Sequence, residues 1–246
     1  MAKVDRRDSS LHVVSTIQHQ EIALSTILVT GANRGIGLSL AKHYAARGDD
    51  VIGACREGSD ALAATGARVE AGVDVTDGAA LAALAKRLGE TRVDVLICNA
   101  GILSKESLGD IDEDGFEQMR RQFEVNALGP LRTVQTLSGH LAKGAKVGIL
   151  TSRMGSVADN GSGGYYGYRA SKAAVNAIGK SLALDLKDRG IAVMLLHPGY
   201  VATEMVGGSG DISPDAAAAQ LVERLDALTL AQTGIFQHAK GDVLPW

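Results

Sequence analysis

The sequence predicts a single α/β domain of the doubly wound class, in which helices cover both faces of a parallel β-sheet. Short apolar runs alternate with longer Ala- and Leu-rich segments from residue 26 onward. Runs that are apolar throughout are typical of strands buried on both faces. The length of 246 residues and the 46% content of hydrophobic residues suit one globular domain with a substantial core.

The predicted strands and helices follow one another in alternation. Strands are expected at Thr26–Thr30, Val51–Cys55, Val93–Cys98, Lys146–Leu150 and Ile191–Leu196. Helices are expected at Ile36–Arg47, Gly78–Leu88, Glu117–His140 and Tyr168–Asp188. A strand, a helix and a second strand in succession form a βαβ unit, whose two strands are parallel.

Two segments fit the alternation less well. Residues 1–25 are predicted to be an N-terminal extension, either disordered or an arm that packs on a partner, and the domain is expected over residues 26–246. The segment Gly207–Pro214 is expected to be a mobile loop. No apolar stretch reaches the ~18 residues of a membrane span, and the first 25 residues lack the apolar block of a signal peptide. We therefore expect a cytoplasmic protein with no membrane partner.

Charge and cysteine content exclude other classes. The 25 Lys and Arg residues nearly balance the 28 Asp and Glu residues, and no basic run stands out, so binding to nucleic acid is not expected. Cys55 and Cys98 each lie within an apolar run and are predicted to be buried thiols. Two such cysteines provide neither a disulfide framework nor a Cys-rich metal site, and no metal is expected.

A glycine-rich turn follows the first predicted strand. Gly31, Gly35 and Gly37 form a Gly-x3-Gly-x-Gly pattern that leads into the first predicted helix. Glycine permits close approach of the backbone, and the N-terminus of the helix offers free N–H groups to a pyrophosphate. The pattern predicts dinucleotide binding, with a plain tight turn as the alternative.

The end of the second predicted strand indicates which dinucleotide binds. An acidic residue there would bind the ribose of NAD, whereas arginine favours the 2′-phosphate of NADP. The strand ends at Arg56, and Arg34 adds a second guanidinium in the glycine turn. We predict NADP(H) rather than NAD(H), although Glu57 argues against it and Arg56 as a solvated loop residue stays an alternative.

Tyr168 and Lys172 lie four residues apart within a predicted helix. This spacing places them on one face, where the ammonium is expected to lower the pKa of the phenol below its ordinary value of about 10. A tyrosine tuned in this way exchanges a proton with an alcohol or carbonyl oxygen.

Together these motifs resemble the short-chain dehydrogenase/reductase family, from about residue 26 to the C-terminus. The motifs that carry the resemblance occur in the family's order: the glycine turn at 30–37, Asp74, Asn99–Gly101, Asn126, Ser152, Tyr168, Lys172 and Pro198–Thr203. Residues 151–156, 163–169 and 240–246 resemble its C-factor-like subgroup, named after a bacterial developmental signalling protein. The resemblance implies a Rossmann fold.

The resemblance also implies four catalytic roles. Tyr168 would protonate the carbonyl oxygen during reduction, and Ser152 would donate a hydrogen bond to the same oxygen. Lys172 would lower the pKa of Tyr168 and bind the nicotinamide ribose. Asn126 would hold a water that connects Lys172 to solvent.

The cofactor contacts implied by the family form a larger set. The glycine turn would hold the pyrophosphate, Asp74 the adenine amino group and Thr203 the carboxamide. The whole set is Gly31, Asn33, Arg34, Gly35, Ile36, Gly37, Arg56, Asp74, Val75, Asn99, Ala100, Gly101, Tyr168, Lys172, Pro198, Gly199, Val201 and Thr203. A strand-ending turn at Asn99–Gly101 and a helix cap at Asp74 stay open as alternatives.

Three other residues near the motifs are weaker candidates for the proton donor. Tyr165 and Tyr166 lack a lysine four residues later and are expected to line the pocket or pack at the helix start. His197 as a general base is a weaker hypothesis than the tyrosine. The Gly-rich insertion Asp159–Gly164 makes the segment between Ser152 and Tyr168 longer than is usual in the family.

The resulting prediction is an NADP(H)-dependent oxidoreductase of the carbonyl reductase type that acts on a small carbonyl or alcohol. The family commonly pairs through helices, here around 115–140 and 168–188, so a homodimer or homotetramer is expected. One alternative is a signalling or regulatory protein that uses the dinucleotide fold as a scaffold. Another is a sugar-nucleotide epimerase with tightly held NAD, which the short C-terminal region disfavours.

Overall fold

A single parallel sheet organises the chain. The computed structural model describes residues 24–246, and within them seven parallel strands lie in the order β3-β2-β1-β4-β5-β6-β7. The strands are β1 (Thr26–Thr30), β2 (Asp50–Ala54), β3 (Arg68–Glu70), β4 (Val93–Cys98), β5 (Leu141–Leu150), β6 (Ala192–His197) and β7 (Ile235–His238). The direction of strand order reverses between β1 and β4, which is where such sheets bind ligands. The predicted fold class is confirmed, whereas the N-terminal extension predicted at residues 1–25 lies almost wholly outside the described residues.

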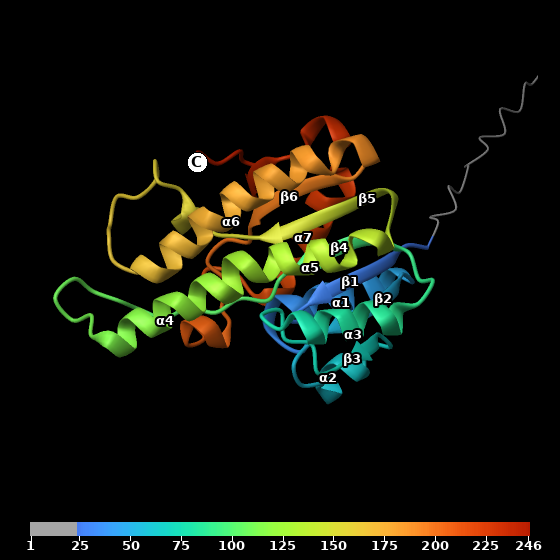
Figure 1. Ribbon diagram of the computed structural model, residues 1–246, viewed down its shortest axis with the longest axis horizontal. Helices are drawn as coiled ribbons and strands as arrows, with labels where there is room; N and C mark the ends of the chain where they lie inside the picture. The colour runs from blue at the N-terminus through green and yellow to red at the C-terminus, as the bar shows by residue number, and fades with distance from the viewer. Residues whose placement is uncertain (1–23) are drawn as a thin grey trace, which may run out of the picture.

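Helices cover both faces of the sheet (Figure 1). One face carries α1 (Gly35–Arg47) and α7 (Pro214–Ala227), which contact each other. The opposite face carries α3 (Gly78–Leu88), α5 (Gly129–Leu137) and α6 (Tyr166–Asp185). A short α2 (Asp60–Ala63) packs beside α1, and α4 (Glu113–Phe123) packs against α6.

The alternation of side chains along β1 builds two separate cores. Leu28 points toward the α3, α5 and α6 layer, whereas Ile27 and Val29 point toward the α1 and α7 layer, and all three are fully buried. Successive side chains of a strand face opposite sides of the sheet, so an all-apolar strand needs cover on both. The predicted burial on two faces is therefore confirmed.

The long helix predicted at Glu117–His140 is interrupted. The chain forms α4, then a π-helical turn at Glu124–Leu128, then α5, and a 3-10 turn at Ser138–His140. The Gly129 amide bonds the Glu124 carbonyl, five residues earlier, as in a π-helix, and Pro130, which follows, has no N–H to donate to the Asn126 carbonyl. The interruption widens the helix at the position of Asn126.

Several elements were not predicted. The edge strands β3 and β7 are three and four residues long and carry charged or polar side chains, so no apolar run marks them. Helix α7 does carry a signal, because Ser213 caps it and Pro214 is its first residue. Strand β5 begins earlier than predicted, at Leu141, with a register shift against β4.

The thiols are buried, as predicted. Cys55 and Cys98 are both free, and burial raises the pKa of Cys98 to about 12. Among the helices that the structure describes, none combines the length and apolar character needed to cross a membrane.

Candidate active site

The glycine turn is a tightly packed cradle at the end of β1. Gly31 and Gly35 have positive φ angles of 66° and 54°, which L side chains rarely adopt. A Cβ on Gly37 would lie 2.2 Å from the Gly31 carbonyl oxygen, so only glycine fits there. The Asn99 amide donates to the carbonyls of Thr30 (2.9 Å) and Gly31 (3.0 Å), which fixes the turn against β4.

The helix that follows the turn starts without a local cap. Arg34 is the N-cap residue of α1 and makes no side-chain cap hydrogen bond, and no acidic residue lies in the first turn. The amide groups at this end and the positive end of the helix dipole therefore suit an anion. Together with the glycine cradle, this arrangement fits the pyrophosphate of a dinucleotide.

Two arginines lie along the predicted adenosine side. The guanidinium of Arg34 forms an exposed ion pair with Glu204 at 2.6 Å, across from the turn. Arg56 follows β2 and is exposed, and its charge acts on Asp74. No acidic side chain ends β2, because the described strand runs into Cys55 and Arg56. A phosphorylated ribose is therefore a better match for this edge than an unmodified one.

Asp74 organises the turn that leads to α3. Burial would raise the pKa of Asp74, but two hydrogen bonds from Thr76 and the nearby Arg56 and Arg121 hold it below its ordinary value. The residue that caps α3 is Asp77, whose side chain accepts from the Ala79 amide, so the helix-cap alternative for Asp74 is wrong.

The remaining predicted cofactor residues line the same edge. Gly35 lies next to Thr203, whose methyl group would be 3.6 Å from a Cβ at that glycine. Val201 is buried and pairs with Ile212, which ties the loop before α7 back to this segment. The others on the edge are Asn33, Ile36, Val75, Ala100, Pro198 and Gly199. Sequence-distant segments thus meet at the carboxyl ends of β1, β2, β4 and β6.

The four predicted catalytic residues come together at the carboxyl ends of β4 and β5. Ser152 follows β5, Tyr168 and Lys172 lie in α6, and Asn126 lies in the π-helical turn. All four are at most 9% exposed. A Cβ on Gly101 would lie 3.2 Å from Asn126 Oδ1 and 3.8 Å from Lys172 Nζ, so the absence of a side chain keeps this space open between them.

The electrostatics of the tyrosine differ from the prediction. Burial raises the pKa of Tyr168 to about 12, and a side-chain hydrogen bond with Ser152 acts in the opposite direction. The expected pKa below 10 is therefore wrong. Lys172 Nζ lies 5.7 Å from the centre of the Tyr168 ring and donates to the Leu150 carbonyl at 2.9 Å instead. Burial lowers the pKa of this lysine to about 8.

Asn126 binds the backbone of the neighbouring loop and a side chain of α6. Its Oδ1 accepts from the Ile102 amide (2.8 Å), and its Nδ2 donates to the Ile102 carbonyl (2.9 Å) and to Ser171 Oγ (3.0 Å). These bonds fasten the loop after β4 to α6. The water proposed from the family resemblance stays a prediction.

His197 is a partly buried, neutral neighbour of the site. Burial, His238, Arg153 and Lys172 lower its pKa to about 3. Its ring packs edge-on against that of His238, with centroids 4.9 Å apart, and its Nδ1 has no hydrogen-bond partner among the described residues. A histidine with so low a pKa is a poor general base near neutral pH.

Sequence reasoning missed two groups of the site. The Leu150 carbonyl is the acceptor for Lys172. Every residue has a backbone carbonyl, so the residue type gives no sign of this contact. Thr30 Oγ1 accepts from the amide of Asn99, which a threonine at a strand end does not indicate by itself. Among residues 24–246, no group of three or more His, Cys, Asp or Glu side chains is arranged to hold a metal.

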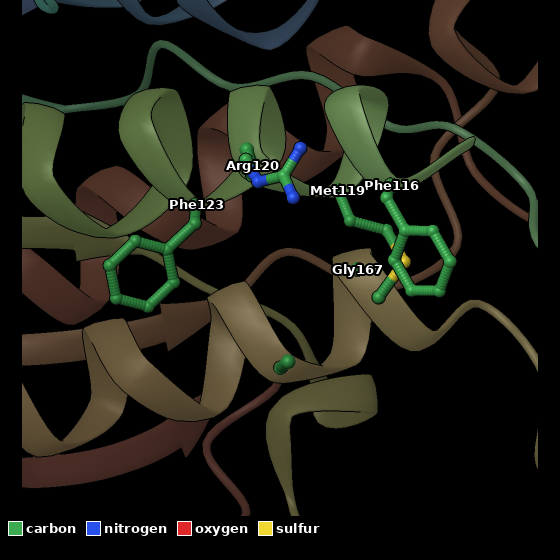
Figure 2. A pocket seen from close by; sticks show the side chains of 6 residues that line it. Phe116, Met119, Arg120, Phe123 and Gly167 are labelled. Atoms are coloured by element: carbon green, nitrogen blue, oxygen red, sulfur yellow. The ribbon is translucent and has the colours of Figure 1, made fainter. Parts of the chain in front are cut away.

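A separate apolar groove of about 260 Å³ lies between α4 and α6. Figure 2 shows Phe116 and Phe123 pointing from α4 toward α6, where Gly167 lies one residue before Tyr168. The two phenyl rings are 43% and 41% exposed. This groove is on the outer helical layer and not at the sheet edge that carries the candidate site.

Comparisons with known proteins agree with the family resemblance of the sequence. The family model described as short chain dehydrogenase matches residues 25–212. A relative from Rhodococcus sp. (strain AD45), 1-hydroxy-2-glutathionyl-2-methyl-3-butene dehydrogenase, is 46% identical over 230 residues, which cover 91% of this chain and all of that protein.

Two further likenesses bear on the predicted subgroup and cofactor. C-signal from Myxococcus xanthus is 41% identical over 157 residues, or 63% of this chain and 93% of that protein, so the C-factor-like resemblance is confirmed. The crystal structure of NADPH-bound carbonyl reductase from chicken fatty liver has a TM-score of 0.81 and 27% identity, and it covers 91% of this chain and 99% of its own.

Proposed function

The chain belongs to the short-chain dehydrogenase family of oxidoreductases, and from this premise we propose that it transfers a hydride between NADP(H) and a carbonyl or alcohol. The observation that carries the proposal is the buried pair Ser152 and Tyr168 beside Lys172, in which Ser152 counteracts the effect of burial on the tyrosine pKa. The reaction class is the reduction of a carbonyl to an alcohol or its reverse.

The cofactor would be held along the sheet edge by the residues described above. Gly31, Gly35 and Gly37 leave room for a pyrophosphate, and the uncapped start of α1 supplies its hydrogen-bond donors. Arg34 and Arg56 would meet the 2′-phosphate. This assignment is supported by the NADPH in the chicken carbonyl reductase structure. When bound, NADPH supplies the hydride.

Tyr168 would act as the general acid in reduction. Its raised pKa keeps the phenol protonated at neutral pH, which a proton donor requires. Ser152 would donate a hydrogen bond to the same substrate oxygen and stabilise the negative charge that develops on it. The oxygen would thus receive one proton from Tyr168 while the carbonyl carbon receives the hydride.

Lys172 and Asn126 would replace the proton that Tyr168 gives up. The lysine still carries its charge for the most part at neutral pH, because its pKa is about 8. Its Nζ faces the open space beside Gly101, which Asn126 Oδ1 also borders. A water in this space would link the two and complete a path for a proton from solvent through Lys172 to Tyr168.

The substrate class is proposed from the site and from the relatives. A fully protonated tyrosine and NADPH favour the reductive direction, so aldehydes and ketones come first. The Rhodococcus relative acts on a primary alcohol that carries a glutathionyl group, as its name states, so a hydroxy thioether of glutathione is the first alcohol to test.

The assembly is proposed to be a homodimer, or a tetramer built from it, through α4 and α6. The groove between these helices exposes Phe116 and Phe123, and apolar rings of this kind are typical of interface cores. The occupant would be the same groove of a second copy.

The decisive experiment is a fluorescence titration of the purified protein with NADPH and with NADH, followed by assay of aldehydes, ketones, quinones and keto esters. We expect NADPH to bind at least tenfold more tightly and at least one carbonyl to be reduced. Tighter binding of NADH would overturn the cofactor assignment. Absence of turnover across the carbonyls and the glutathione thioether alcohol would overturn the enzymatic function.

A signalling role is the second candidate, because C-signal is a 41% identical relative. The variant Tyr168→Phe separates the two functions. Loss of turnover together with loss of the cellular role supports the enzyme, whereas a cellular role that survives without turnover supports signalling.

A further inference from the structure

Glu106 is a buried carboxylate in the loop between β4 and α4, and it has no part in the proposed chemistry. It is 6% exposed. Its Oε1 accepts from Gln122 Nε2 (2.7 Å) and Ser104 Oγ (2.8 Å), and its Oε2 accepts from the Gly167 amide (3.1 Å). The three donors are neutral, and they come from α4, from the loop itself and from α6. One carboxylate therefore joins three segments.

Helix α6 depends on this carboxylate for its first turn. Its N-cap residue, Tyr165, has a positive φ of 53° and makes no side-chain cap hydrogen bond. The amides of the first turn have no partner within the helix. Glu106 supplies what is missing, since its carboxylate binds the Gly167 amide and its carbonyl accepts from the Tyr165 amide at 2.9 Å. A negative charge at this end also interacts favourably with the helix dipole.

Gln122 and Asn126 extend the same connection along the neighbouring helix. They are four residues apart, which places them on one face, and both are essentially fully buried. Gln122 Oε1 accepts from the Ser104 amide (3.0 Å), while Asn126 binds both backbone groups of Ile102. The loop after β4 is thus held at alternate residues by one helix face.

Two of these contacts flank the proposed general acid. Glu106 binds α6 at Gly167, one residue before Tyr168, and Asn126 binds it at Ser171, three residues after. The helices approach closely here, because a Cβ on Gly167 would lie 2.5 Å from Gln122 Nε2. A shift of Glu106 or Gln122 would therefore move the backbone of Tyr168 directly.

We infer that Glu106 and Gln122 are a pair of positioning residues, which set the first turn of α6 and thereby the Tyr168 hydroxyl relative to Ser152. The inference rests on the proposed function, since it assigns these residues a role in the same site. Neither residue is expected to touch substrate or cofactor.

The test is Glu106→Gln. This variant keeps the size of the side chain, but its new NH2 donor has to face another donor, either the NH2 group of Gln122 or the Gly167 amide. We expect kcat for the carbonyl that the wild type reduces to fall about tenfold or more, because small misplacements of a catalytic group are costly. NADPH affinity should change less than twofold, because most of the predicted cofactor contacts lie outside α6, on the glycine turn and the loops that follow β2, β4 and β6. Hydrogen exchange of the amides of residues 165–168 should become faster.

Two controls separate positioning from general stability. Glu70→Gln alters another 6% exposed glutamate, which pairs with Arg68 and Arg87 away from the site, and it should lower the melting temperature but leave kcat within twofold. The exchanged pair Glu106→Gln with Gln122→Glu again matches donors to acceptors and should restore kcat to within about threefold of wild type. If Glu106→Gln does not fold, Ser104→Ala removes one donor from the same carboxylate and should give a milder loss of kcat.

The inference is overturned if Glu106→Gln keeps kcat within twofold of wild type, or if Glu70→Gln lowers kcat as much as Glu106→Gln does. It is also overturned if the exchanged pair does not restore kcat. Hydrogen exchange decides the matter independently of turnover. If the wild type reduces no carbonyl, the proposed function fails. Faster exchange at 165–168 in Glu106→Gln and not in Glu70→Gln then still supports the positioning of α6, and unchanged exchange overturns it.

Discussion

Lys172 Nζ donates a hydrogen bond to the backbone carbonyl of Leu150, 2.9 Å away. Leu150 is the last residue of β5 and stands two residues before Ser152. The bond therefore joins the helix that carries Tyr168 to the end of the strand that leads to Ser152. We expect the lysine in this arrangement to align the two hydroxyl groups as well as to contribute charge.

Lys172→Met is expected to lower kcat about a hundredfold, because it removes both the charge beside the phenol and the link to β5. Steady-state kinetics with NADPH and a reduced carbonyl measures the effect. Lys180→Met is the matched control on the same helix, since Lys180 Nζ only approaches the Gly234 carbonyl at 3.5 Å, and it should leave kcat unchanged. Equal losses in the two variants would contradict the role of Lys172.

Tyr168→Phe is expected to lower kcat by a factor of about 10² to 10⁴ with little change in NADPH affinity, since general acid catalysis contributes that much. Tyr166→Phe removes a hydroxyl from a partly exposed neighbour and should leave kcat unchanged. Stopped-flow measurement of NADPH oxidation gives the rate of the reduction step itself. A Tyr168→Phe enzyme that retains more than a tenth of the wild-type kcat would rule out the tyrosine as proton donor.

Gly37→Ala is expected to destabilise the fold by about 1–3 kcal/mol, because the new methyl group would overlap the Gly31 carbonyl oxygen and the Asn99 amide. NADPH binding should weaken as the cradle opens. Gly78→Ala is the control, since a Cβ there meets nothing within 4 Å at the start of α3. Denaturant unfolding and NADPH titration of both variants test this, and equal stabilities would contradict it.

Acid should destabilise the protein through His197. Its pKa is about 3 in the folded state and 6.5 ordinarily, so below pH 6.5 the unfolded chain takes up a proton that the folded protein does not. The free energy of unfolding should therefore fall as pH decreases, by about 2 kcal/mol at pH 5 from this group. In His197→Gln the loss between pH 8 and 5 should be smaller by that amount, as urea unfolding at each pH will measure. An unchanged slope would argue against the assignment.

Phe116→Lys with Phe123→Lys is expected to convert the proposed dimer to monomers, because two charges would have to be buried in the groove between α4 and α6. Sedimentation velocity reports the oligomeric state. Leu108→Lys changes an exposed apolar residue outside the groove and should leave the assembly intact. A double variant that sediments like the wild type would place the interface elsewhere.

Much of the fold was predictable because its strongest signals are local. The runs at β1 and β4 and the helix at α3 have the predicted bounds, since each is apolar or amphipathic over its whole length. The edge strands β3 and β7 were not predicted because they are short and carry polar side chains. The break at Asn126 lies just before Pro130, but a proline just after a glycine is also typical of an ordinary helix start.

The sequence by itself determined the identity and order of the candidate site residues, because the motifs carry specific residue types at fixed spacings. It also indicated the family and the strand-helix alternation. Only the tertiary structure decided the partner of Lys172, the raised pKa of Tyr168 and the contacts of Glu106 with α6. Burial depends on what the rest of the chain places around a group, and the Leu150 and Glu106 contacts join residues 22 and 61 positions apart along the chain, so spacing could not reveal them.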